Sequence, residues 1–143
     1  GGRSAVLTGL LACHTEVVLL PENEHRSIDQ WFEERSGQVE KRVLIAQVEI
    51  VEAEKTVFES VGRSPNDQPI VCCAASLDNH KELRIAFGGF GEHPVLAYKG
   101  QYSEEAWEKA ADILKGTDDE WASGRYRLNA GKALARRMVE SLG

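Results

Sequence analysis

The side chains best suited to nucleophilic or metal chemistry are three cysteines and four histidines: Cys13, Cys72, Cys73, His14, His25, His80 and His93. Cys72 and Cys73 are neighbours in an extended segment, so their side chains point to opposite faces and do not readily ligate one metal. The histidines fall in separate expected loops or element ends, without HxxxH or His-Cys spacing. We therefore predict no metal site, and three reduced, inert thiols typical of a cytoplasmic protein.

Residues 84–97 (RIAFGGFGEHPVLA) form the most informative segment, because three glycines follow an alternating apolar stretch. A phosphate-binding loop needs glycines spaced so that backbone amides converge at the start of a helix. Gly88, Gly89 and Gly91 lack the GxGxxG spacing and have no Lys-Ser/Thr pair after them, and Pro94 restarts the chain as extended. The segment predicts a tight turn or β-bulge rather than a nucleotide cradle.

Charged and aromatic clusters have structural explanations. The acidic run 118–120 resembles a cation cluster, but residues 117–120 also fit a helix capping box, which needs fewer assumptions. The basic residues of the last segment predict a solvated or partner-facing helix surface: Arg125, Arg127, Lys132, Arg136 and Arg137. A net charge of −6 does not favour nucleic-acid binding. The tryptophans are expected as core or interface anchors: Trp31, Trp107 and Trp121.

The pattern of apolar residues and turns predicts one α+β domain of 143 residues. No apolar run approaches the roughly 20 residues that cross a bilayer, so we expect no membrane association. Polar loops are expected over 35–41 and 62–69. Helices are expected over 4–13, 27–34, 103–114 and 123–142, and strands over 15–20, 42–52, 56–61, 70–77, 83–88 and 95–97.

Several segments, in this order, resemble the C-terminal part of the FAD-binding (medium) subunits of molybdenum hydroxylases, the xanthine dehydrogenase and carbon monoxide dehydrogenase family. Each motif alone is soft, but their shared order and spacing cover most of the chain. The segments are 10–20 (LLACHTEVVLL) with 27–32 (SIDQWF), 44–50 (LIAQVEI), 58–71, 84–97 and 123–137.

The resemblance implies an α/β half-sandwich: a small antiparallel sheet of three to four strands with three helices packed on it, preceded by a short helix-strand-helix segment. It divides the chain into 1–41, a remnant of the second FAD-binding subdomain, and 42–143, the C-terminal-like domain. In the family, the intact subunit holds FAD, accepts electrons from iron–sulfur clusters and passes them to NAD or another acceptor. The implied partners are a molybdopterin-binding large subunit and an iron–sulfur small subunit.

The resemblance also suggests four cofactor-binding positions and no catalytic residue. Ile45 falls where an apolar side chain packs toward the flavin ring. Glu59 falls where the family has a lysine, which reverses the charge near the cofactor. Arg63 and Asp67 keep the family's loop motif, although an ion pair or turn cap is the favoured explanation of these two residues. The family's pyrophosphate-binding glycine segments have at most a trace in Gly1-Gly2.

Two functions follow. The chain is either the C-terminal part of a flavoprotein subunit, inactive and free of FAD when isolated, or a non-catalytic assembly module that kept the fold and lost the flavin. Glu59 and the candidate exposed tryptophans favour the module, which could also form a homo-oligomer. An unrelated enzyme using Cys72 or Cys73 is the third alternative. Whether the sequence is a trimmed piece or a naturally short protein stays open.

Overall fold

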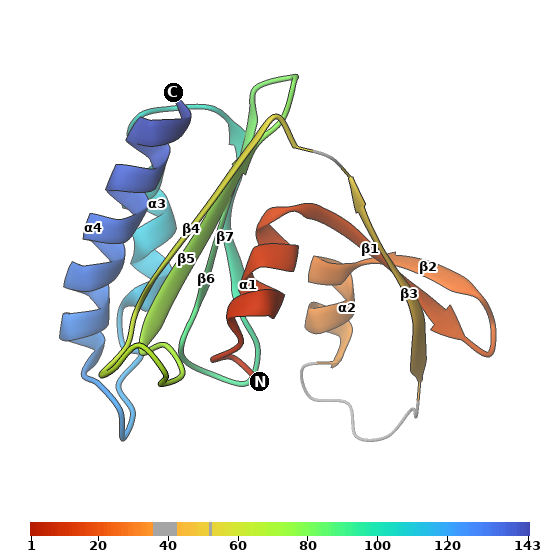
Figure 1. Cartoon of the computed structure of the whole chain (residues 1–143), viewed down its shortest axis with the longest axis horizontal. Helices are drawn as coiled ribbons and strands as arrows, with labels where there is room; N and C mark the ends of the chain where they lie inside the picture. The colour runs from red at the N-terminus through yellow and green to blue at the C-terminus, as the bar shows by residue number, and fades with distance from the viewer. Residues whose placement is uncertain (36–42, 52) are drawn as a thin grey trace.

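A computed structural model describes residues 1–35, 43–51 and 53–143. It confirms an α+β fold with two small antiparallel sheets (Figure 1). No helix in these ranges is both long and apolar enough to cross a membrane. The helices are α1 (Ala5–Ala12), α2 (Ile28–Arg35), α3 (Ala106–Ala111), the 3₁₀ turn η1 (Asp112–Leu114) and α4 (Gly124–Leu142). The strands are β1 (His14–Leu20), β2 (Glu24–Ser27), β3 (Leu44–Val51), β4 (Lys55–Val61), β5 (Val71–Leu77), β6 (Glu82–Gly88) and β7 (Val95–Gln101).

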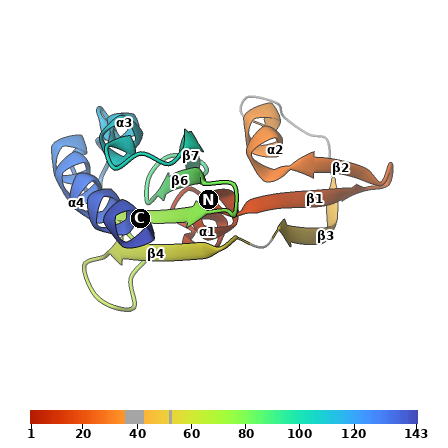
Figure 2. The ribbon, with the colours of Figure 1, turned by 90° about the horizontal axis from the view of Figure 1, so that it is seen from above.

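The four-stranded sheet, in the order β4-β5-β6-β7, is the centre of the molecule. Helices α3 and α4 cover one face and α1 covers the other, as Figures 1 and 2 show. Every residue of β5 is buried, and its run of small side chains lets other elements approach both faces. Cys73 belongs to the core under α4, whereas the Cys72 Sγ lies 3.4 Å from the Thr8 Oγ1 of α1. The two thiols therefore occupy opposite faces.

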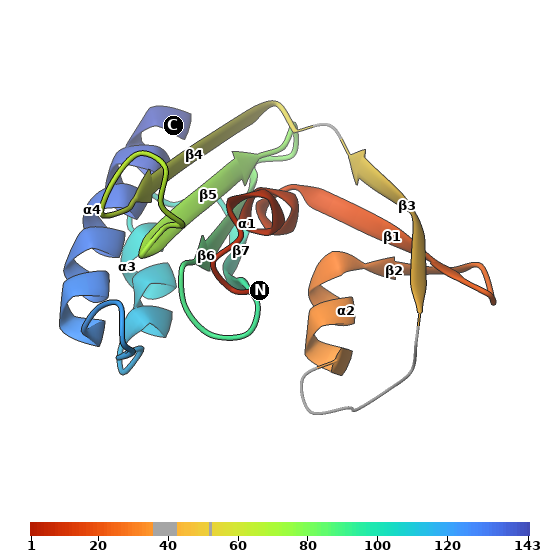
Figure 3. The ribbon, with the colours of Figure 1, turned by 60° about the horizontal axis from the view of Figure 1, so that its bottom comes forward.

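The three-stranded sheet, in the order β2-β1-β3, extends away from α4 (Figure 3). Its inner face packs against α1 and α2 through alternate residues of β1, Val17 and Leu19. The same apolar cluster includes Ala74 of β5 and Ala86 of β6. This shared cluster joins the two sheets into one body, because neither sheet could bury its apolar face alone.

Strand β3 departs from this pattern of burial. All eight of its residues are exposed although five of them are large and apolar: Leu44, Ile45, Val48, Ile50 and Val51. Its β-branched composition predicted a strand correctly, and its partner on one side is β1. The opposite edge of β3 pairs with no strand among the described residues.

The glycine-rich segment is a turn and not a phosphate loop. Gly89 has a φ of +106°, and a Cβ there would lie 2.4 Å from the Ile70 carbonyl oxygen. A Cβ on Gly88 would lie 2.2 Å from the Thr8 Oγ1. The glycines are thus required by left-handed backbone at Gly89 and by the close approach of α1 and β5.

Three local predictions were wrong. Strand β2 (Glu24–Ser27) was not predicted, and its last residue was expected to begin a helix; pairing with β1 overrides its weak strand propensity. The helix expected from residue 103 begins at Ala106 and ends in the 3₁₀ turn η1. Strand β7 continues to Gln101, beyond the expected 95–97. The expected loop over 35–41 and the boundary at 41/42 lie outside the described residues, apart from Arg35.

Candidate functional site

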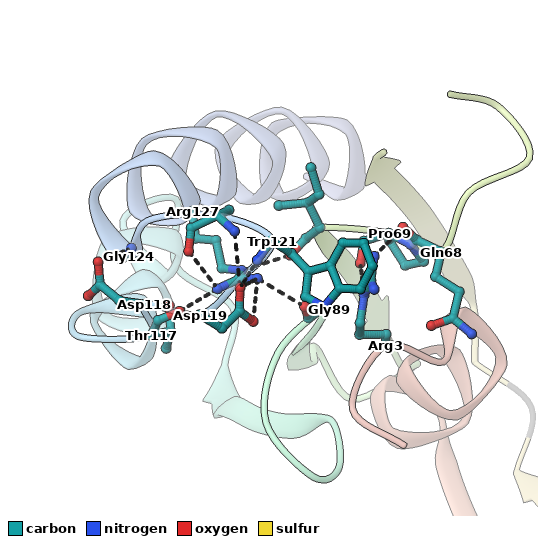
Figure 4. A network of polar contacts seen from close by, with 12 residues as sticks. Arg3, Gln68, Pro69, Gly89, Thr117, Asp118, Asp119, Trp121, Gly124 and Arg127 are labelled. Carbon is teal, nitrogen blue, oxygen red and sulfur yellow. Dashed lines mark hydrogen bonds and ion pairs between the residues drawn. The ribbon is translucent and has the colours of Figure 1, made fainter. Parts of the chain in front are cut away.

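Arg127 of α4 is the most connected polar side chain in the described ranges, and none of its side-chain surface is exposed (Figure 4). Its Nε donates to the Ile70 carbonyl oxygen at 2.9 Å, and its Nη2 donates to both carboxylate oxygens of Asp119 at 2.7 Å. Further donations reach the carbonyls of Thr117, Ala122 and Gly89. Arg127 therefore ties α4 to the start of β5 and to the glycine turn.

The prediction that Arg127 faces solvent or a partner was wrong. Arg127 lies four residues before Gly131, on the buried face of α4. That face continues through Leu134, Ala135 and Met138. The 3/4 spacing of these positions includes position 127. The burial of Arg127 could therefore have been predicted from the sequence. A charged residue at a buried position of an amphipathic helix predicts a network of acceptors.

The loop before α4 supplies several of these acceptors, and its structure corrects the predicted capping box. Ser123, not Thr117, caps the helix, and its Oγ accepts from the Tyr126 N–H. Asp118 Oδ1 accepts from the Gly124 N–H at 3.0 Å. Asp119 Oδ1 accepts from the backbone N–H of Trp121 and of Ala122 at 2.9 and 3.0 Å. Asp118 and Asp119 therefore serve the fold, and Asp119 supplies the counter-ion that the buried Arg127 guanidinium needs.

The same contacts set the ionisation of Asp119. Desolvation opposes its charged form, but hydrogen bonds from Arg127 and from two backbone N–H groups outweigh that cost. The pKa of Asp119 is therefore lowered, and the carboxylate stays ionised around Arg127. This arrangement stabilises the fold and leaves neither group available for chemistry.

Beside this network, Trp121 lies between two arginines from distant parts of the chain. The guanidinium carbons of Arg3 and Arg63 lie 4.2 and 5.0 Å from the centre of the indole ring. Arg3 is held by donations to the Gln68 and Pro69 carbonyl oxygens at 2.9 and 3.2 Å. Arg63 Nη2 donates to the Trp121 carbonyl oxygen at 3.4 Å.

These side chains line a hollow of about 340 Å³ together with Asp67 and Gln68. Each guanidinium has five N–H donors, and only some are used by carbonyl oxygens. Two cations on one aromatic ring repel each other, so a phosphate or carboxylate group would reduce that repulsion. Asp67 supplies one opposing charge, which leaves the hollow with a net positive charge. The hollow can therefore accept a singly charged anionic group.

The four positions suggested by the family resemblance lie in separate places. Arg63 and Asp67 both line the hollow, although no ion pair between them is recorded within the described ranges. Ile45 lies on the exposed strand β3, with 39% of its surface accessible. Glu59 lies on β4 and pairs with Arg137 of α4. The sequence did not point to Arg3 or Trp121 here, because their contacts span most of the chain.

Cys72 and Cys73 do not form a nucleophilic site. Both are buried in β5, and burial raises the pKa of each thiol. A thiol held in its protonated form is a poor nucleophile. The expectation of inert packing at these two positions agrees with this environment.

Comparisons with known proteins show that this chain shares its fold with several solved structures. No protein-family model matches the sequence, and no curated protein matches it. Among solved structures, a chain of quinoline 2-oxidoreductase from Pseudomonas putida 86 aligns with a TM-score of 0.70 and 19% identity, over 99% of this chain and 56% of that chain. A chain of carbon monoxide dehydrogenase from Hydrogenophaga pseudoflava that lacks the Mo-pyranopterin moiety aligns with a TM-score of 0.66 and 16% identity, over 96% and 54%.

A chain of the Cu,Mo-containing CO dehydrogenase in its cyanide-inactivated form aligns with a TM-score of 0.67 and 19% identity, over 98% and 59%. The present chain therefore spans somewhat more than half the length of these proteins. At these identities the likeness shows the fold alone. It covers almost the whole chain, including both sheets.

Proposed function

We propose that this chain is the C-terminal part of the FAD-binding electron-transfer subunit of a molybdopterin-dependent dehydrogenase. The observation that carries the proposal is the fold match over at least 96% of the chain to chains of oxidoreductases of this type. The motif order along the sequence supports the same subunit independently. In this proposal the chain alone has no dehydrogenase activity, and it works in the cytoplasm with a molybdopterin-binding and an iron–sulfur subunit.

The exposed face of β3 fits such a role. Ile45 presents apolar surface that a flat flavin ring could cover, and Ile50 and Val48 extend this apolar strip. A long exposed apolar strand is an aggregation hazard unless something covers it. FAD, where bound, supplies the chemistry of accepting and passing on electrons. The part of this chain is to pack against the ring and to exclude water.

Glu59 fits the cofactor less well than the family lysine would. Its carboxylate pairs with the Arg137 guanidinium, so its charge is compensated within this chain. The pair removes the repulsion that a bare carboxylate would exert on an anionic cofactor, but it supplies no positive charge. This observation favours a second candidate, an assembly module that docks with the partner subunits without holding flavin.

Flavin retention and partner capture test both functions. The purified chain is expected to show no stoichiometric absorbance near 450 nm after gel filtration with excess FAD. The immobilised chain is expected to capture co-expressed molybdopterin-binding and iron–sulfur subunits. Flavin that stays with the isolated chain, or capture of neither subunit, would overturn the proposal. A complex that forms but stays colourless when reconstituted with FAD identifies the assembly module.

A matched pair of variants tests the role of β3. Ile45→Asp places a charge on the exposed strand and is expected to weaken capture at least tenfold. Val6→Asp places the same charge on α1, at a residue that is 72% exposed. This variant is expected to leave capture unchanged. Equal capture by both variants would remove β3 from the docking surface.

A further inference from the structure

We propose that Glu16, His25 and Glu49 form a binding site for a divalent transition metal such as Zn²⁺. The three side chains come from β1, β2 and β3, and their ligand atoms all lie within 4.8 Å of one another. His25 Nδ1 lies 4.0 Å from Glu16 Oε2. The proposal is independent of flavin binding and of the partner subunits.

Strand register holds these groups together. Glu16 lies directly opposite Glu49 in the antiparallel β1–β3 pair. On the other side of β1, His25 lies opposite Val18, two residues along from Glu16 and therefore on the same face. Val17 lies between Glu16 and Val18 in β1 and belongs to the buried cluster on the inner face. The three ligands therefore share the outer face of the sheet, and backbone hydrogen bonds fix their spacing.

The electrostatics of this face favour a cation. Like charges directly opposite each other in a strand pair destabilise the sheet, and Glu16 and Glu49 form such a pair. Within the described ranges, neither carboxylate has an ion pair with lysine or arginine. The His25 ring is the nearby basic group that the described residues place against Glu16. A divalent cation bound between the two carboxylates would turn this repulsion into attraction.

Glu49 is also held in a suitable orientation. Gln47 Nε2 donates to Glu49 Oε1 at 2.8 Å, which leaves the second carboxylate oxygen for a metal. Hydrogen bonds of this kind orient carboxylate ligands in known metal sites. Gln47 lies two residues before Glu49 on β3, so both side chains share the outer face. The site thus has a supporting residue as well as three ligands.

The donor set selects the class of metal. One imidazole nitrogen and two carboxylate oxygens suit Zn²⁺ and its neighbours better than Ca²⁺ or Mg²⁺, which prefer oxygen alone. Zinc–ligand bonds of about 2.0–2.2 Å bring two ligand atoms to within about 4.4 Å of each other. The His25 and Glu16 side chains are about half exposed and have room to close that difference. Three protein ligands leave a fourth position for water.

Calorimetric titration of the tag-free chain with ZnCl₂ tests the site. One equivalent is expected to bind saturably. His25→Ala and Glu49→Gln are each expected to weaken binding by at least about tenfold, since even loss of a supporting residue costs roughly 10- to 100-fold. The matched control is His80→Ala, which removes an exposed histidine from the turn before β6 in the other sheet. Equal affinity in the His25→Ala and wild-type chains would overturn the proposal, as would the absence of saturable binding.

Two further measurements separate ligand loss from misfolding. Co²⁺ bound by the wild-type chain is expected to give visible absorption bands that Zn²⁺ abolishes and that Glu49→Gln lacks. The melting temperature is expected to rise with Zn²⁺ in the wild type and in His80→Ala, but not in Glu49→Gln. Co²⁺ bands that persist in Glu49→Gln and His25→Ala would place the metal elsewhere and refute the site.

Discussion

Strands β5 and β3 are both rich in apolar residues, yet they have opposite environments. Every residue of β5 is buried between α4 and α1, whereas every residue of β3 is exposed. The small side chains of β5 allow helices to approach on both faces, and Arg127 ties α4 down at its start. Strand β3 pairs along one edge, and among the described residues its main contacts are with β1 rather than with a helix. The four-stranded sheet therefore carries the stability, and the three-stranded sheet offers surface for contacts.

Removing Arg127 is expected to have the largest effect on this difference. Arg127→Ala leaves the Asp119 carboxylate and several carbonyl oxygens without their donor. We expect the free energy of unfolding to fall by about 3 kcal/mol or more. Urea denaturation followed by circular dichroism measures it. The neighbouring exposed Arg125→Ala serves as control, with an expected change within about 0.5 kcal/mol. Similar losses in both variants would contradict a structural role for the buried network.

The same truncation in each sheet measures the difference directly. Ile85→Ala in β6 removes a fully buried side chain and is expected to cost about 2–5 kcal/mol. Ile50→Ala in β3 removes a side chain that is 57% exposed and is expected to cost less than about 1 kcal/mol. Both values come from urea midpoints and slopes. If the two costs are equal, β3 is buried in solution, most simply by self-association, and dilution would reveal that.

The next largest effect is expected in the pH dependence of stability that Asp119 contributes to the four-stranded region. The lowered pKa of Asp119 means that its contribution is fully present above the ordinary Asp value of about 3.9 and is lost as pH falls through the lowered value. Asp119→Asn is expected to reduce stability at pH 7 and to flatten the decline of stability below about pH 4. Thermal melts from pH 6 to pH 2 measure both effects. A parallel decline in the two proteins would show that Asp119 is not coupled to folding.

The smallest effect is expected at the surface pair between β4 and α4. Glu59 and Arg137 are both well exposed, so solvent and salt screen their attraction. Glu59→Gln is expected to leave the urea midpoint unchanged within error in 0.5 M NaCl. A clear loss of stability at that salt concentration would show that the Glu59–Arg137 pair contributes to folding stability.

Much of the fold could be predicted from local pattern. The cap at Ser4, the long helix after Ser123 and the small-residue strand β5 follow directly from capping chemistry and apolar spacing. Strand β2 could not be predicted, because only its pairing with β1 makes its polar residues extended. The acidic run before α4 was misassigned for a similar reason. Asp119 of this run pairs with Arg127, and the two meet only because the loop folds back onto α4.

The candidate sites were predicted less well. Arg63 and Asp67 were singled out from the sequence and do share a hollow. Arg3 and Trp121, which complete it, lie far apart in the sequence, near the N-terminus and in the loop before α4. The Glu16–His25–Glu49 group has no recognisable spacing, because its members are brought together by strand pairing on both sides of β1.

The sequence by itself determined the α+β class, the inert burial of Cys72 and Cys73, and the turn at Gly89. Those features depend on residue size, alternation and backbone freedom, which act over a few neighbouring positions. Tertiary structure alone decided which acceptors surround Arg127, that β3 is exposed and that three candidate ligands meet across one sheet face. Burial and long-range pairing depend on which surfaces meet in space, and a local pattern does not contain that information.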